Sequence, residues 1–152
     1  MKKLLIVLGM VFIVLLVGIA GLIGYAAFTG SRLDKESKAY VDAAVPAIIS
    51  SWNEQELFSR ASPEFQKAAS PADMERFFRW FRTLGRMHKY EGAEGESVTS
   101  VTQQAGKVVY ARYVAKAIFD AGEADIEVGL IKHGNQWQIT RFNVTSPALV
   151  PQ

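Results

Sequence analysis

The stretch between Lys3 and Arg32 contains no charged residue, and Leu4 to Phe28 is an almost unbroken run of Leu, Ile, Val, Gly, Ala and Phe. At about 1.5 Å per helical residue this run reaches roughly 37 Å, and the hydrocarbon core of a bilayer is about 30 Å thick. The run therefore predicts one transmembrane helix within an N-terminal segment, residues 1–30. The remaining residues, 31–152, are long enough for one soluble domain.

A secretory signal peptide is the alternative to an anchor. Such a signal has an apolar region of about 7 to 15 residues followed by a cleavage site of small residues. The run here is longer, which favours an uncleaved signal-anchor, although Ala26 and Ala27 leave cleavage open. The sequence contains no cysteine, so a lipid cannot be attached through one.

The orientation of the span does not follow from the flanking charges. Lys2 and Lys3 precede the span, and Arg32, Lys35 and Lys38 follow it, so the positive-inside rule does not decide. A short stub before the span and a whole domain after it is the layout of an exported domain. We therefore expect a single-pass protein of the bacterial inner membrane with its C-terminal domain in the periplasm.

Small residues recur within the span. Gly18, Gly21 and Gly24 are spaced by three, and Ala20 with Gly24 forms a small-xxx-small pair. Such residues let two helix backbones approach closely, so a homodimer through the span is one hypothesis.

The net positive charge of the protein belongs to the anchor. The chain has 17 basic and 15 acidic residues, and Lys2 and Lys3 account for the difference. The domain is therefore neutral, whereas nucleic-acid-binding domains are usually basic. We expect no nucleic acid as a partner, and instead a protein partner at the membrane surface.

The first half of the domain has helical periodicity. Helices are expected over residues 33–52, 53–60, 63 onward and 71–84. Pro46 interrupts the first by a kink or a restart. Ser62-Pro63 and Ser70-Pro71 each place a capping hydroxyl before a proline at the first helical position, and Gly85 ends the last helix.

The helix over 71–84 has two chemically different faces. One face is largely aromatic: Met74, Phe77, Phe78, Trp80, Phe81 and Leu84. The opposite face carries Arg76, Arg79, Arg82 and Arg86. The simplest interpretation is a helix that faces the core and has a solvated basic back. The alternatives are that this back receives an acidic protein partner or lies on anionic lipid headgroups.

The second half changes to the alternating periodicity of strands, interrupted by glycine-containing breaks. Expected strands cover Arg86–Glu91, Ser97–Gln104, Lys107–Phe119, Glu123–Lys132 and Gln136–Val144. The predicted class is α+β: a transmembrane helix, then about three to four helices packed on a curved antiparallel sheet of four to five strands. If Asp120 pairs with Glu123, four apolar pairs, from Phe119 with Ala124 to Tyr113 with Leu130, share one face.

A family resemblance rests on these elements. Trp52 and Leu57 form a Trp-x-x-x-x-Leu step, and the last strand opens with Gly134-Asn135-Gln136-Trp137-Gln138-Ile139. Residues 33–144 resemble the nuclear-transport-factor-two-like (cystatin-like) α+β roll, as found in small bacterial exported domains with a membrane anchor. Such domains often serve as interaction or ligand-holding modules. An anchor with this roll is also similar to the inner-membrane assembly component of type IV secretion machines.

Sequence motifs for catalysis are missing. The chain has no cysteine nucleophile, no Gly-x-Ser-x-Gly and no phosphate-binding loop, and neither His88 nor His133 has a neighbour at metal-ligand spacing. We therefore expect no catalytic residue, metal or cofactor. Enzymes of the roll place an Asp or His with a Tyr in a pocket, which implies Tyr110, Tyr113 and Asp125 as candidates. Our strand alternation puts Tyr113 and Asp125 on opposite faces.

Two main functions remain from the sequence, and a membrane-surface sensor whose basic helix lies on lipid headgroups is a third. The first is a non-enzymatic, membrane-anchored interaction or assembly module that uses the arginine face. The alternative is a binder of a small apolar ligand, or a weakly signalled enzyme, with a pocket between sheet and helices lined by Phe81, Tyr113, Trp137 and Ile139.

Overall fold

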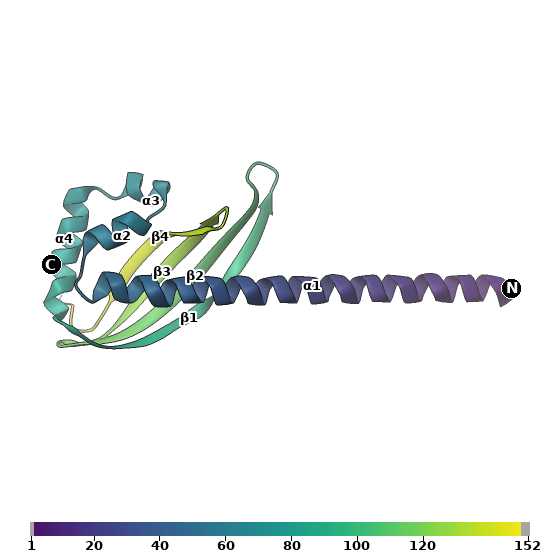
Figure 1. Cartoon of the computed structure of the whole chain (residues 1–152), viewed down its shortest axis with the longest axis horizontal. Helices are drawn as coiled ribbons and strands as arrows, with labels where there is room; N and C mark the ends of the chain where they lie inside the picture. The colour runs from purple at the N-terminus through teal and green to yellow at the C-terminus, as the bar shows by residue number, and fades with distance from the viewer. Residues whose placement is uncertain (1, 150–152) are drawn as a thin grey trace. The chain divides into compact units, whose positions relative to one another are not determined.

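The computed structural model describes residues 2–149 and divides the chain into two compact units, Met1–Leu33 and Asp34–Gln152. The described helices are α1 (Lys2–Ile49), α2 (Glu54–Arg60), α3 (Pro63–Ala68) and α4 (Pro71–Phe81), which continues as a 3-10 turn, Arg82–Leu84. The strands are β1 (Met87–Thr102), β2 (Gly106–Phe119), β3 (Gly122–His133) and β4 (Gln136–Thr145) (Figure 1). The predicted α+β class, with helices on an antiparallel sheet, is confirmed.

The first unit is the apolar part of α1. Within residues 2–149, α1 is the one helix long and apolar enough to cross a membrane, and a signal sequence near the N-terminus has the same properties. Its described large apolar side chains are exposed, which is stable in lipid and costly in water. A side chain built at Gly18, Gly21 or Gly24 would meet no atom within 4 Å. The pairing of two spans stays a prediction.

The structure shows one helix where the sequence suggests two. α1 includes residues 29–32 and runs through Pro46 to Ile49. Pro46 is tolerated because it lies in the last turn of α1, where its missing N–H removes one intrahelical hydrogen bond. The backbone then turns at Trp52, whose φ of 46° is in the left-handed region.

Each of the shorter helices begins at a capping residue. The Asn53 side chain accepts a hydrogen bond from the Gln55 N–H at 3.0 Å. Ser62 accepts one from Phe65 at 3.2 Å, and Ser70 accepts one from Asp73 at 3.1 Å. The predicted caps at Ser62 and Ser70 are confirmed, whereas Asn53, expected as the first residue of its helix, is the cap.

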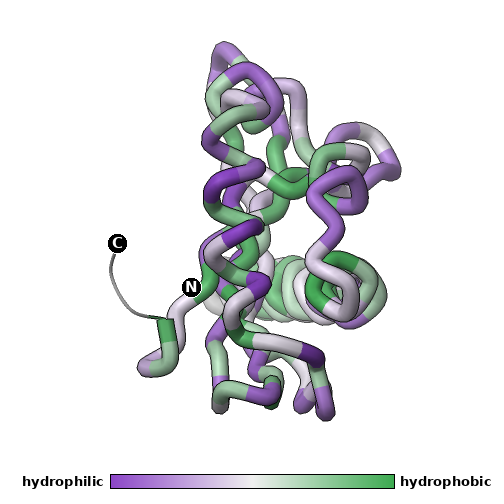
Figure 2. Tube along the Cα trace, turned by 90° about the vertical axis from the view of Figure 1, so that its left-hand side faces the viewer, coloured by the Kyte–Doolittle hydropathy of each residue, from purple (hydrophilic) through white to green (hydrophobic). Residues whose placement is uncertain are grey.

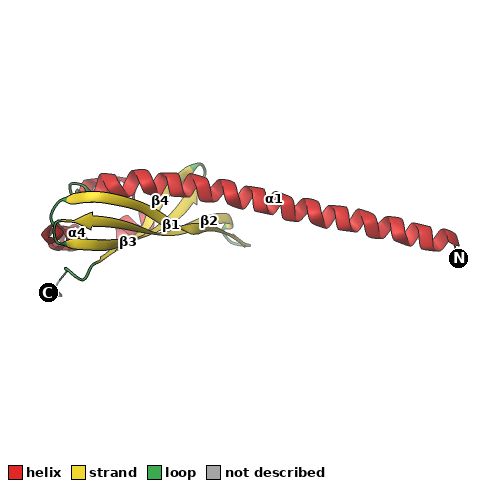
Figure 3. Ribbon diagram, turned by 90° about the horizontal axis from the view of Figure 1, so that it is seen from below, coloured by secondary structure: helices red, strands yellow, loops and turns green. Residues whose placement is uncertain are grey.

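The strands form an antiparallel meander in the order β1-β2-β3-β4 (Figure 1), and the view from below shows the twist of the sheet (Figure 3). The two strands expected over 86–91 and 97–104 are one continuous strand, so the predicted break between them is wrong. The two glycines between these segments, Gly92 and Gly95, do not form a turn. Gly92, with a φ of 97°, lies at a bulge, and Gly95 packs so closely on Arg112 that a side chain would collide with its carbonyl oxygen.

The predicted register of the β2–β3 hairpin is also wrong, by two residues. Phe119 pairs with Gly122 and Ala117 with Ala124, so the turn is Asp120–Ala121. The predicted face is nevertheless correct, because a shift of two residues leaves every side chain on its side of the sheet. Contacts with the start of β1 hold this turn: the Asp120 N–H donates to the Arg86 carbonyl at 3.0 Å, and the Asp120 carboxylate accepts the Arg86 N–H at 2.7 Å.

The core lies between one face of the sheet and the helices of the second unit. Its largest fully buried side chains come from both layers: Val41, Val45, Ile48, Ile49, Leu57, Phe78, Leu84, Tyr113, Ile126, Val128, Leu130 and Ile139. Trp52 joins the layers, with its ring 5.2 Å from that of Phe119 on β2 and 5.6 Å from that of Phe81 on α4. The opposite face of the sheet carries charged pairs such as Arg112 with Glu127.

Protonation of Asp120 should make the free energy of unfolding fall at acidic pH. Hydrogen bonds from the Arg86 backbone and from His88 lower the pKa of this carboxyl below its ordinary value of 3.8. The stability it contributes is therefore present above about pH 4 and is lost as the pH falls through the lowered pKa. We expect Asp120→Asn to destabilise the full-length protein more at pH 7 than at pH 3. Denaturant unfolding in detergent, followed by tryptophan fluorescence, measures this; an equal loss at both pH values would contradict it.

Candidate functional site

The outer side of α4 combines an exposed aromatic ring with two arginines. Met74, Phe78 and Phe81 face the core and are buried, as the sequence predicts. Phe77 belongs to the same predicted apolar face, but it is 44% exposed because it lies at the rim of the helix–sheet contact. The colour of α4 changes repeatedly between purple and green along its length, as expected for a helix with two faces (Figure 2).

A small cavity lies beside Phe77. Its volume is about 90 Å³, and it is lined by residues of α2, α3, α4 and β4: Leu57, Phe65, Met74, Phe77, Phe78, Phe81, Phe142 and Asn143. Phe142 stacks on Phe78 with ring centroids 6.4 Å apart. Apart from Asn143, the lining is entirely apolar.

The four predicted arginines separate into two pairs. Arg76 and Arg79 are exposed, with 72% and 73% of their side chains accessible, and each forms an ion pair on its own helix, with Asp73 at 2.8 Å and Glu75 at 2.7 Å. The Arg76 guanidinium also lies 5.7 Å from the centre of the Phe77 ring. We call Arg76, Phe77 and Arg79 the α4 surface.

The other two arginines contact the fold. Arg82 donates a hydrogen bond to the Trp52 carbonyl at 3.2 Å, which links the end of α4 to the left-handed turn after α1. Arg86 binds the Asp120 carboxylate through its backbone N–H at 2.7 Å. Substituting Arg82 would therefore alter the fold as well as the surface, whereas the contacts of Arg86 with Asp120 are made by its backbone.

The structure does not gather the four predicted pocket residues around this cavity. Phe81 lines it, whereas Tyr113, Trp137 and Ile139 are not among its lining residues. Ile139 is buried opposite Leu130 and forms a bridge with Ala61. Lys132 lies 5.4 Å above the Trp137 ring.

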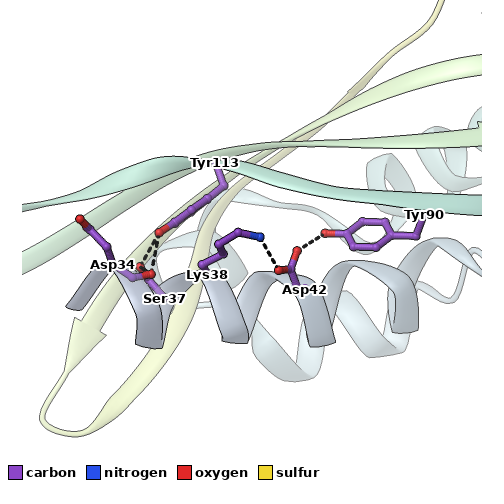
Figure 4. A network of polar contacts seen from close by, with 6 residues as sticks. All are labelled: Asp34, Ser37, Lys38, Asp42, Tyr90 and Tyr113. Atoms are coloured by element: carbon purple, nitrogen blue, oxygen red, sulfur yellow. Dashed lines mark hydrogen bonds and ion pairs between the residues drawn. The ribbon is translucent and has the colours of Figure 1, made fainter. Parts of the chain in front are cut away.

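Tyr113 belongs to a polar seam between α1 and the first two strands (Figure 4). Its hydroxyl is 2.8 Å from the Ser37 hydroxyl and donates to the Asp34 carbonyl at 3.0 Å. The Asp34 carboxylate accepts the Ser97 N–H at 2.8 Å. Sequence reasoning missed this seam, because the partners are more than 60 residues apart and each alone is an ordinary polar residue in a helix or strand.

A second part of the seam joins Asp42 to two partners. Asp42 accepts a hydrogen bond from the Tyr90 hydroxyl at 2.8 Å and pairs with Lys38 at 2.6 Å. Burial, followed by the bond to Asp42, raises the pKa of Tyr90 well above its ordinary value of 10.0. Burial also raises the pKa of Tyr113. Both phenols are therefore protonated near neutral pH and serve as hydrogen-bond donors that attach the helix to the sheet.

An open cleft of about 430 Å³ lies next to this seam at the bulged part of β1. Its lining includes two lysines and two glutamates: Lys38, Glu91, Gly92, Ala93, Glu94, Val114 and Lys116. Because the charges balance, the cleft has no electrostatic preference for an anion or a cation.

The residues considered for catalysis lie apart from one another. Tyr113 faces the helices, whereas Asp125 and Tyr110 lie on the other face of the sheet, opposite Lys116 and Ile131 respectively. The Tyr110–Ile131 pair and the Lys116–Asp125 pair are six residues apart along β2, which is about 20 Å. Over residues 2–149 no group of three or more His, Cys, Asp or Glu side chains could hold a metal ion.

Comparison with known proteins gives no family assignment. No protein-family model matches the chain, and no curated protein matches it.

The hydroxyl pair in the seam gives a stability prediction. Tyr113→Phe and Ser37→Ala should each lower the free energy of unfolding by about 1–3 kcal/mol, because each removes a buried hydroxyl that contacts the other hydroxyl and donates to the Asp34 carbonyl. The loss in the double variant should be smaller than the sum of the two single losses, because both single variants break the same hydroxyl–hydroxyl contact. Denaturant unfolding of the two single variants and the double variant measures the coupling. Losses that simply add in the double variant would contradict the coupling.

Proposed function

We propose that this chain is a non-enzymatic, membrane-anchored exported domain that binds a protein partner at the membrane surface through the α4 surface. The observation that carries the proposal is the exposed Phe77 ring, which borders an apolar cavity and lies between two exposed arginines on the same helix.

The chemistry of this surface fits a protein partner. Aromatic residues and arginine are enriched at the centres of protein interfaces, where they contribute much of the binding energy. The cavity of about 90 Å³ is well below the roughly 300–1,000 Å³ of small-molecule sites, and it suits one large apolar side chain. The ion pairs of Arg76 and Arg79 are exposed, so each contributes little to stability and can be exchanged for a partner carboxylate. The partner is therefore a protein segment with a large apolar side chain beside acidic residues.

The cellular setting is part of the same proposal. The long apolar helix supports a single-pass anchor, and in this proposal the domain that follows it lies in the bacterial periplasm. The order of elements, helices followed by an antiparallel meander with the helices on one face, supports membership of the nuclear-transport-factor-two-like roll.

Charge reversal on the α4 surface tests the proposal. In Arg76→Glu with Arg79→Glu, the partner's acidic residues meet like charges, so we expect recovery of crosslinked partner from cells to fall at least tenfold. The control is Lys89→Glu with Lys107→Glu, an equal charge change at two exposed positions on the sheet. Arg82 is left unchanged because it holds the Trp52 carbonyl. Crosslinking that responds equally to both double variants would refute the proposal.

Truncation of the exposed ring is an independent test. Phe77→Ser should weaken partner binding by about 2 kcal/mol or more, which is roughly thirtyfold, because the aromatic anchor is lost. Tyr110→Ser is the matched control, since Tyr110 is 46% exposed on the other face of the sheet. Titration of each purified full-length variant in detergent with the partner recovered by crosslinking measures the two binding constants. The same variants can be tested for binding to anionic vesicles. If Phe77→Ser and the arginine variants weakened vesicle binding and left partner binding unchanged, the surface would be a lipid site and the proposal would fail.

A further inference from the structure

The two edges of the sheet, β1 and β4, are protected unequally. The edge of β4 contacts the connection between α2 and α3: Ala61 forms a bridge with Ile139, and the Ser62 N–H donates to the Ile139 carbonyl at 2.8 Å. The first part of β1 is irregular, with register shifts between Met87 and Lys89 and between Tyr90 and Gly92. Bulges and covering segments are the devices by which proteins prevent strand edges from pairing with other chains.

The end of β1 lacks these devices. Residues 98–102, which we call the distal edge, have the sequence Val-Thr-Ser-Val-Thr, with no charge, glycine or proline. Val98 and Val101 are 57% and 76% exposed. The pairing of this segment with β2 is regular, from Val98 with Tyr110 to Thr102 with Gly106. A regular, uncharged edge rich in β-branched residues is a template for strand addition.

The hydrogen bond of the Ser97 N–H shows which backbone groups of the distal edge point away from β2. Its N–H donates to the Asp34 carboxylate on α1 and therefore points away from β2. In an antiparallel strand the backbone groups of alternate residues point to the same side. Because the pairing is regular beyond Ser97, the N–H and C=O groups of Thr99 and Val101 also point away from β2, towards the open edge.

We propose that the distal edge pairs with the distal edge of a second copy of this chain, antiparallel and about a two-fold axis at Ser100. In that register Thr99 of each copy lies opposite Val101 of the other copy. The N–H and C=O groups of these residues, which point away from β2, then form hydrogen bonds across both pairs. Val98 of one copy lies opposite Thr102 of the other, and the two Ser100 residues lie opposite each other. Valine and threonine have nearly the same shape, so the segment is its own complement.

Charge also favours a second copy as the occupant. No charged residue lies within the paired segment, and Glu96 would lie opposite Gln104, so no like charges meet directly across the pair. A two-fold pairing is closed, because it consumes both distal edges and leaves none to extend the sheet further. This pairing is independent of the α4 surface.

Crosslinking by a single cysteine tests the pairing, since the natural chain has none. Facing residues in a non-hydrogen-bonded antiparallel pair have Cα atoms about 4.5 Å apart, within the range that a disulfide spans. Full-length Ser100→Cys in native membranes should form a disulfide-linked dimer on mild oxidation at least fivefold more than Thr145→Cys, an exposed position at the end of β4. Equal dimer formation by the two variants would overturn the proposal.

A proline substitution separates pairing from folding. Thr99→Pro removes an N–H that points away from β2, so the β1–β2 ladder keeps its hydrogen bonds. Added to Ser100→Cys, it should reduce the disulfide-linked dimer at least fivefold while tryptophan fluorescence and circular dichroism are unchanged. Val101→Lys, which places a charge on the edge without altering the backbone, should give the same loss. Undiminished dimer in a folded Val101→Lys, Ser100→Cys protein would refute strand pairing.

Discussion

The second unit depends on the packing of helices against one face of a single sheet, and Trp52 is at the centre of that contact. Its ring stacks between Phe119 of the sheet and Phe81 of α4. Its backbone has a φ of 46°, a left-handed conformation that costs a bulky residue roughly 1–3 kcal/mol. The aromatic contacts and the hydrogen bond from Arg82 to its carbonyl offset that cost. The turn between α1 and α2 is thereby set by tertiary contacts.

A sheet covered on one side leaves its edges to be protected by other means. The polar seam does this for the middle of β1, because Asp34 binds the Ser97 backbone and Asp42 binds the Tyr90 side chain. The same seam leaves the distal edge beyond Ser97 open. The helices that build the core also create the α4 surface, since a helix seated on the rim of a sheet buries Phe78 and Phe81 but leaves Phe77 exposed. Both proposed interaction surfaces thus follow from where the covering layer ends.

Much of the fold follows from local chemistry. The caps at Ser62 and Ser70 and the stop at Gly85 require only neighbouring residues, and the structure confirms them. Predictions that needed long-range information were wrong. The β2–β3 register is set by the contact between Asp120 and Arg86, 34 residues apart, and a two-residue slip conserves the apolar face, so periodicity cannot detect it. The continuity of β1 depends on Gly95 packing against Arg112, which no local pattern reveals.

The candidate site divides in the same way. By itself the sequence determined the apolar helix, the neutrality of the domain and the two faces of the helix over 71–84, because these depend on composition and on the 3.6-residue period. Only the tertiary structure decided which arginines contact the rest of the fold, since the Arg82 side chain binds the Trp52 carbonyl and the Arg86 backbone binds Asp120. It also decided that Phe77 is exposed, that Tyr113 binds the first helix and that the distal edge is open. These properties depend on which segments meet in space, and hydrophobic periodicity specifies a face but not its neighbour.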